Sequence, residues 1–189
     1  MVDPFHNGYL GAAAAAIDCA NLARVVFIPA AQPPHRPPAI AKAEQRIEMA
    51  RLGTEGESRF MVSDLELNRE GPSYTVDTLK HIGQHRPEDE LFLILGWDAA
   101  QLFSTWRKPD EVSDLATIVV VARPGSEAPR EEDLKGAGLD NERVVLCLRP
   151  TPDVSASEIR RAVAAGKAIT GKVPLAVERY IASHWLYAR

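Results

Sequence analysis

Hydrophobic residues along this chain of 189 residues gather in short runs that are separated by polar segments. Five runs rich in β-branched side chains are predicted as strands, and they cover residues 24–29, 60–67, 91–95, 117–122 and 143–148. Several of these runs are almost continuously apolar. That pattern is typical of parallel strands that are covered on both faces.

The segments between the runs carry apolar residues at helical spacing. Three such stripes predict helices, and they consist of Leu10, Ala13, Ala14 and Ile17, of Ile159, Ala162 and Val163, and of Val173, Val177, Tyr180, Ile181 and His184. A further helix is predicted to hold Val76 and Leu79, and residues 123–141 indicate a connector that is partly helical around Glu131. Strands that alternate with helices predict a doubly wound α/β fold, here as a single domain over residues 1–189. Ligands of such sheets bind beyond the carboxyl ends of the strands.

Composition and charge exclude several function classes. Hydrophobic residues make up 46% and charged residues 25%, as in ordinary soluble globular proteins. The net charge of -4 argues against a general binder of nucleic acid or of membrane surfaces, since such proteins are normally basic. No apolar run reaches the roughly 20 residues that span a bilayer, and the N-terminus lacks the basic and apolar regions of a signal peptide, so we expect a cytoplasmic protein.

The two cysteines, Cys19 and Cys147, lie far apart and in no spacing typical of a metal site. Small free cysteines are most often buried and behave as hydrophobic residues. We therefore predict two buried side chains, without a disulfide framework or a zinc site.

The first candidate for chemistry runs from Asp3 to Leu10 and reads Asp-Pro-Phe-His-Asn-Gly-Tyr-Leu. Pro4 favours a turn, and Gly8 allows close backbone approach where a helix is predicted to begin. The first N–H groups of a helix and its dipole attract phosphate, and His6 adds a donor or a positive charge. A single histidine near a chain end is also common as an incidental surface residue, so this segment alone leaves both interpretations open.

The second candidate is the segment 154–160, Val-Ser-Ala-Ser-Glu-Ile-Arg. Ser155 and Glu158 match a capping box, which by itself predicts only a well-capped helix. With Ser157 and Arg160, the segment also brings two hydroxyls and a guanidinium to a positive helix end, which suits an anion. The two interpretations are compatible.

Three further segments combine turn residues with polar or aromatic side chains. Residues 33–36, Pro-Pro-His-Arg, are either a cationic clamp for phosphates or an ordinary surface turn. In residues 71–75, Gly-Pro-Ser-Tyr-Thr, Ser73 is predicted to cap a helix, and Tyr74 is either a core residue or a ligand contact. Gly96 and Asp98 directly follow an apolar strand, where they suit a nucleotide sugar.

In order and spacing, these segments resemble the bacterial nicotinate mononucleotide adenylyltransferases, within the HxGH nucleotidyltransferase superfamily. The family's opening pattern, Gly-Gly-[Thr/Ser]-Phe-Asp-Pro-x-His-x-Gly-His-Leu, is matched at Asp3, Pro4, His6, Gly8 and Leu10. Its Ile-Ser-Ser-Thr-x-Ile-Arg pattern is matched at Ser155, Ser157, Ile159 and Arg160. The likeness also includes residues 33–36 and 72–75, Gly96 and Asp98, Trp106, residues 122–125 and residues 180–187, so it covers nearly the whole chain.

The resemblance implies a Rossmann-like doubly wound parallel sheet with flanking helices that binds ATP and nicotinate mononucleotide. The phosphate of the mononucleotide attacks the α-phosphorus of ATP, which gives nicotinate adenine dinucleotide and pyrophosphate in NAD biosynthesis. This reaction requires the protein to position the substrates and to neutralise phosphate charge, and no covalent enzyme intermediate is expected. Mg²⁺ is expected to bind through the substrate phosphates and water, so no protein ligand for the metal is named.

The resemblance also implies roles for individual residues. His6 and Arg160 are implied as catalytic, because they neutralise charge on the transferring and departing phosphates. The implied contacts to ATP and its phosphates are Asp3, Gly8, Tyr9, His35, Arg36, Gly96, Asp98, Ser155, Ser157 and Arg160. The implied contacts to the mononucleotide are Tyr74, Thr75, Trp106 and Arg123.

Two features depart from the family pattern. Tyr9 stands where the family has its second histidine, and a phenol donates a hydrogen bond but carries no positive charge at neutral pH. Losing one transition-state donor of this kind typically costs about 10²–10³ in rate. The family's first strand and Gly-Gly turn also precede this segment, whereas Met1 and Val2 stand directly before Asp3. Since the first strand of such a sheet is central, we expect the biological protein to begin upstream.

Two alternative functions remain open from the sequence. One is a sister adenylyltransferase that uses nicotinamide mononucleotide or another phosphorylated acceptor such as phosphopantetheine. Tyr74, Thr75 and Trp106 favour an acceptor with a pyridine ring, but they distinguish poorly between nicotinate mononucleotide and its amide, nicotinamide mononucleotide. The other alternative is a catalytically impaired nucleotide-binding relative, which Tyr9 and the short N-terminus favour.

Overall fold

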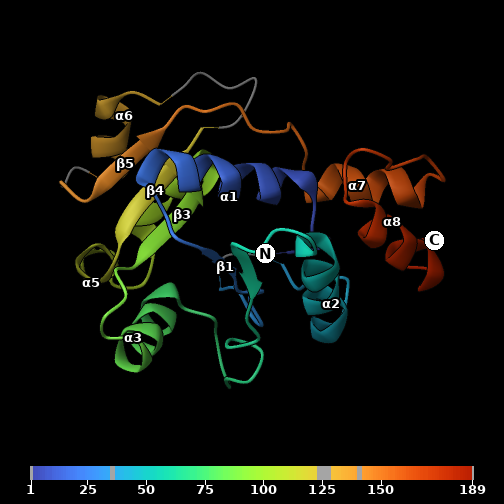
Figure 1. Cartoon of the computed structure of the whole chain (residues 1–189), viewed down its shortest axis with the longest axis horizontal. Helices are drawn as coiled ribbons and strands as arrows, with labels where there is room; N and C mark the ends of the chain where they lie inside the picture. The colour runs from blue at the N-terminus through green and yellow to red at the C-terminus, as the bar shows by residue number, and fades with distance from the viewer. Residues whose placement is uncertain (1, 35–36, 123–128, 140–141, 189) are drawn as a thin grey trace. The chain divides into compact units, whose positions relative to one another are not determined.

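Parallel strands and the helices that connect them make up the structure, a computed structural model that describes residues 2–34, 37–122, 129–139 and 142–188 (Figure 1). The chain divides into two compact units. The first unit comprises Met1–Gly11, Ala23–Ser73 and Pro152–Arg189, and the second comprises Ala12–Leu22 and Tyr74–Thr151. The first helix, α1 (Asn7–Ala20), therefore begins in the first unit and ends in the second. Among the described residues, no helix has the length and apolarity to cross a membrane.

The first unit contains two short parallel strands, β1 (Val25–Phe27) and β2 (Phe60–Val62). Its helices, besides the first turn of α1, are α2 (Ala43–Thr54), α7 (Ala156–Ala164) and α8 (Leu175–Ser183). Side chains alternate along a strand, so Val25 is buried and Val26 is exposed. The core of this unit includes the fully buried side chains of Phe5, Met49, Ile159 and Val177.

The second unit contains three parallel strands in the order β3 (Phe92–Gly96), β4 (Thr117–Val121) and β5 (Val144–Cys147) (Figure 1). The central strand β4 is covered on both faces, which explains its unbroken apolar sequence. The helices of this unit are α3 (Thr75–His85), α4 (Trp97–Ala100), α5 (Pro109–Leu115) and α6 (Glu131–Gly136), with a 3₁₀ turn at Phe103–Thr105. Their core includes Val76, Phe103, Val112 and Leu139.

The predicted α/β class with parallel strands is confirmed. Each predicted strand is found, and four of them are shorter than predicted, whereas β3 has the predicted length but is shifted by one residue toward the C-terminus. The second strand is shortened most, because the chain turns after β2 and the Leu67 N–H donates to the Asp64 carbonyl at 2.8 Å. The predicted helices are found as α1, α3, α6, α7 and α8, whereas α2, α4 and α5 were not predicted. The strand pairing adds a detail that the sequence does not show, since the described strands pair as two separate sheets, one in each unit.

The prediction for the cysteines is wrong. Cys19 of α1 and Cys147 of β5 form a disulfide bond within the second unit, with their Cα atoms 5.8 Å apart. They meet because Ala15 and Ala16 of α1 pack in one apolar cluster with β4 and Cys147. The two cysteines are 128 positions apart in the sequence, and no local pattern in the sequence indicates this pairing.

Candidate active site

His6 lies directly before α1 and is almost completely buried, with 7% of its surface exposed. Its imidazole stacks on the ring of Tyr9, with ring centroids 4.1 Å apart and planes 24° apart. Tyr9 also stacks on Phe5, which is fully buried in the core of the first unit. Tyr9, which replaces the second histidine of the family pattern, therefore holds the imidazole of His6 in place.

The beginning of α1 lies against the segment that leads into α7. A Cβ atom at Gly8 would stand 2.9 Å from Nδ1 of His6 and 3.2 Å from the carbonyl oxygen of Val154. A Cβ atom at Gly11 would stand only 2.2 Å from Cδ of Pro152. Glycine is thus required at both positions by close contact. The beginning of α1 and the segment that leads into α7 therefore lie in close contact within the first unit.

Ser155 caps α7 as the sequence predicts. Its side-chain oxygen accepts a hydrogen bond from the Glu158 N–H at 3.3 Å, and it lies 3.3 Å from the hydroxyl oxygen of Ser157. Ser155 is half-buried and Ser157 is exposed. Two neighbouring hydroxyls therefore stand at the positive end of α7, an arrangement that suits phosphate oxygens.

Asp3 links the segment before α1 to α7 through a hydrogen bond. Its backbone carbonyl accepts a hydrogen bond from Nη1 of Arg160 at 2.6 Å, and this contact fixes the guanidinium against the His6 segment. Asp3 is buried, with 1% of its surface exposed. Its carboxylate accepts hydrogen bonds from the Ile40 N–H at 2.9 Å and from the Ala41 N–H at 3.2 Å. The geometry gives Asp3 a supporting position, and its predicted contact with phosphate stays a prediction.

Arg46 is a charged residue of this region that the sequence interpretation missed. It belongs to α2, is 2% exposed, and donates from Nη1 to the carbonyl of Ala30 at 2.6 Å. Burial lowers the pKa of Arg46 from its usual value, while the nearby carboxylate of Asp3 acts in the opposite direction. Its position in the sequence could have indicated its burial, because Arg46 shares the buried face of α2 with Ile47, Met49 and Ala50. An arginine on such a face indicates a buried anion partner.

Ser73 holds the loop after β1, in place of the helix cap predicted for it. Its hydroxyl oxygen accepts from the N–H groups of Ala31 and Gln32 at 3.0 and 3.1 Å. The N-cap of α3 is Tyr74, without a side-chain cap bond. The predicted phosphate contacts His35 and Arg36, and the predicted mononucleotide contact Arg123, lie outside the described residues.

In the second unit, Gly96 ends β3 and Asp98 lies in the first turn of α4. Both residues are exposed at the carboxyl end of their strand, as the strand-end rule predicts for a nucleotide contact. Trp97 between them is buried in the core instead. The two binding candidates are therefore exposed, whereas the residue between them packs in the core.

The predicted mononucleotide contacts Tyr74, Thr75 and Trp106 belong to the same unit. Tyr74 and Trp106 are half-buried and pack against one apolar cluster, and Trp106 lies 5.6 Å from Phe103 between ring centroids. The guanidinium of Arg107 sits 4.5 Å above the centroid of the Tyr74 ring. Arg107 was not predicted, although a cation next to an expected aromatic contact was a visible signal.

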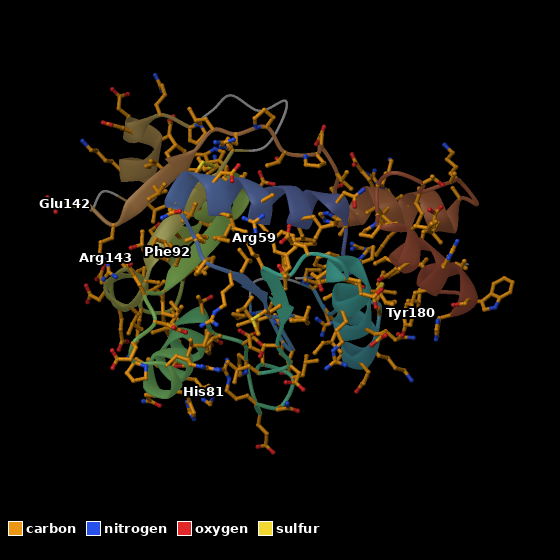
Figure 2. The ribbon with its side chains drawn as sticks, in the orientation of Figure 1. Arg59, His81, Phe92, Glu142, Arg143 and Tyr180 are labelled. Atoms are coloured by element: carbon orange, nitrogen blue, oxygen red, sulfur yellow. A yellow bond between two sulfur atoms is a disulfide. The ribbon has the colours of Figure 1, made fainter. Side chains whose placement is uncertain are left out.

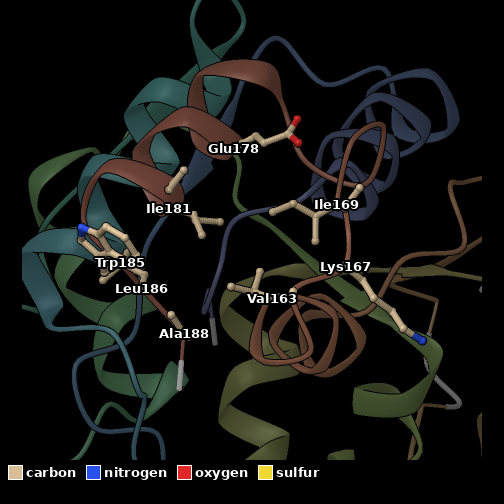
Figure 3. A pocket seen from close by; sticks show the side chains of 11 residues that line it. Val163, Lys167, Ile169, Glu178, Ile181, Trp185, Leu186 and Ala188 are labelled. Carbon is tan, nitrogen blue, oxygen red and sulfur yellow. The ribbon is translucent and has the colours of Figure 1, made fainter.

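A hollow of about 410 Å³ lies elsewhere in the first unit, beside α7 and α8 (Figure 3). Its walls include Val163, Ile169 and Ile181, whose side chains point into it, whereas Lys167 points away. None of the predicted site residues that the structure describes lines it. The candidate site is therefore defined by the polar residues around His6 and not by this apolar hollow.

Comparison with known proteins identifies the family. The cytidylyltransferase-like family matches residues 2–162. A protein of Thermus thermophilus named "Probable nicotinate-nucleotide adenylyltransferase" is 46% identical over 185 residues, which cover 98% of this chain and 94% of the relative. The chain belongs to the nicotinate-nucleotide adenylyltransferase family. This family membership makes it a nucleotidyltransferase.

Other relatives agree with this assignment. A protein of the same name from Thermomicrobium roseum is 38% identical, over 98% of this chain and 87% of the relative. The solved nicotinic acid mononucleotide adenylyltransferase of Plasmodium falciparum, complexed with APC, matches with a TM-score of 0.78 over 98% of this chain and 92% of that one. At 16% identity this match concerns the fold alone, and it confirms the Rossmann-like nucleotidyltransferase architecture.

Proposed function

We propose that the chain transfers the adenylyl group of ATP to nicotinate mononucleotide, a reaction of NAD biosynthesis. A phosphate oxygen of the mononucleotide attacks the α-phosphorus of ATP. The bond from that phosphorus to the oxygen bridging to the β-phosphate breaks, and pyrophosphate leaves with the electron pair. The products are nicotinate adenine dinucleotide and pyrophosphate.

The observation that carries this proposal is the meeting of two helix beginnings at His6 and Ser155 in the first unit. His6 donates to the phosphate that gathers negative charge, and its stacking on Tyr9 keeps the ring oriented before substrate arrives. Ser155, Ser157 and Arg160 hold the departing phosphates. Donors that are fixed in advance do not reorganise during the reaction, which is how phosphoryl-type transfers are accelerated.

Tyr74, Thr75 and Trp106 hold the pyridine ring of the acceptor, and Gly96 with Asp98 contacts the nucleotide. The cation at Arg107, above Tyr74, favours an acceptor that carries a carboxylate over its amide. A Trp106→Ala variant should mainly weaken binding of the mononucleotide and leave ATP binding nearly unchanged.

Mg²⁺ fits this arrangement when it is bound to the substrate phosphates. The described residues around the two helix beginnings offer hydroxyl, imidazole and guanidinium groups, and the carboxylate of Asp3 already accepts bonds from backbone N–H groups. When bound, the metal supplies further neutralisation of phosphate charge. The protein residues then orient the phosphates and carry the rest of that charge.

The test is an assay with ATP, Mg²⁺ and either nicotinate or nicotinamide mononucleotide, in which product formation is measured as the release of pyrophosphate. His6→Ala should lower kcat by about 10²–10³ with little change in ATP affinity, because the interaction strengthens in the transition state. His81→Ala is the matched control, since His81 is an exposed residue of α3 (Figure 2). A loss of ATP binding without a change in kcat would show that His6 has a different role.

A further inference from the structure

Tyr187 reaches the carboxylate of Asp3 from the C-terminal segment. Its hydroxyl donates a hydrogen bond to Oδ1 of Asp3 at 2.7 Å, although the two residues are 184 positions apart. Asp3 therefore accepts hydrogen bonds from three segments: from the backbone N–H groups of Ile40 and Ala41 before α2, from Arg160 of α7, and from the C-terminal segment. These contacts join in one buried residue, three positions before His6.

The backbone of Tyr187 is held in an unfavourable conformation. Its φ is 62°, in the left-handed region that bulky residues rarely adopt. Such a conformation persists only where the surroundings determine it strongly. Here the ring is 8% exposed, it belongs to the same apolar cluster as Phe5, and the hydroxyl is bonded to Asp3.

The hydroxyl stays a donor at neutral pH. Burial raises the pKa of Tyr187 above its usual value, and the hydrogen bond to Asp3 raises it further. The hydrogen bond from the Tyr187 hydroxyl to Asp3 therefore keeps its proton at neutral pH.

We propose that Tyr187 is a positioning residue for adenylyl transfer, which holds Asp3 so that His6 and Arg160 keep their places. The proposal rests on the proposed function. Asp3 fixes Arg160 through its carbonyl and the backbone of residues 40 and 41 through its carboxylate. When the Tyr187 hydroxyl is lost, the carboxylate loses a donor and the segment that carries His6 gains freedom.

Tyr187→Phe tests this inference, with Tyr180→Phe as the matched control. Tyr180 lies on α8 (Figure 2). Its ring stacks on His184 with centroids 4.0 Å apart. We expect Tyr187→Phe to lower kcat by about 10- to 100-fold with little change in either KM, because misplaced groups weaken the transition state more than substrate binding. Tyr180→Phe should retain the wild-type kcat. An unchanged kcat in Tyr187→Phe would overturn the proposal.

Hydrogen exchange gives a readout that does not need catalysis. In Tyr187→Phe, the amides of residues 40 and 41 should exchange faster than in the wild type, while those of β4 stay protected. A rise that is uniform along the chain would identify Tyr187 as a general stabiliser and overturn the positioning role. Failure of the wild type to form product would instead overturn the proposed function, and the local exchange would still report the contact with Asp3.

Discussion

The stacking of Tyr9 on His6 changes what a substitution at position 9 is expected to do. Tyr9→Ala should lower kcat by about tenfold, because an aromatic pair of this kind contributes roughly 1 kcal/mol to holding the imidazole. Tyr9→Phe keeps the ring and should retain most of the activity. Steady-state rates of dinucleotide formation measure both variants. Equal losses in the two variants would mean that the phenol hydroxyl itself takes over the part of the family's second histidine.

Tyr187 also gives the stability of the protein a defined pH dependence. Its folded pKa is raised above the unfolded value of about 10, so its contribution is complete below that pH and is lost as the pH rises further. The free energy of unfolding in urea, measured from about pH 8 to pH 11, should fall more steeply for the wild type than for Tyr187→Phe. Parallel curves would show that the hydroxyl titrates normally in the folded protein.

The residues of the candidate site could be predicted unequally. His6, Gly8, Ser155 and Arg160 lie in short motifs, and the structure brings them together in the first unit. Tyr187 could not be found in this way, because its importance comes from one buried hydrogen bond across 184 positions. The spacing of motifs indicates side chains that face a ligand, but it does not show the buried polar contacts that hold those side chains in place.

At the scale of elements, the contact between α1 and the segment before α7 predicts an effect of filling Gly11. A Cβ atom there would meet Cδ of Pro152 at 2.2 Å, so Gly11→Ala should force the two segments apart. We expect a loss of about 1–3 kcal/mol in unfolding free energy and a lower kcat. Urea denaturation and steady-state kinetics measure the two effects.

Gly83→Ala is the matched control for this prediction. Gly83 lies inside α3, and a Cβ atom there would meet nothing within 4 Å. Alanine favours a helix over glycine by about 1 kcal/mol, so this variant should be slightly more stable than the wild type. Equal stability of Gly11→Ala and Gly83→Ala would contradict the close packing at Pro152.

The helices and strands differ in how well they can be predicted from the sequence. The strand β4 is predicted correctly because a central parallel strand needs apolar side chains on both faces. The helix α2 is missed because its inward face includes the charged Arg46 and its N-cap is Lys42, which is not a preferred capping residue. A buried ion thus conceals the periodicity that would otherwise mark the helix.

For the whole molecule, the alternation of strands and helices predicts the fold class but not its division. The first unit is assembled from three separate stretches of chain, and α1 passes from one unit into the other. Hydrophobic patterns describe neighbours in sequence, so they carry little information about which distant segments share a core. The disulfide bond between Cys19 and Cys147 belongs to the same class of long-range features.

That disulfide predicts how the whole molecule responds to reduction. It links positions 128 residues apart, and a cross-link over so long a loop restricts the unfolded chain by about 2–5 kcal/mol. Dithiothreitol should therefore lower the thermal midpoint of the wild type, and the double variant Cys19→Ala with Cys147→Ala should start near that reduced value. The double variant should not respond to the reductant, because it has no bond to break. A wild type whose midpoint is the same with and without dithiothreitol would show that the two sulfurs are not linked in solution, and that apolar packing without a covalent bond holds α1 on β4.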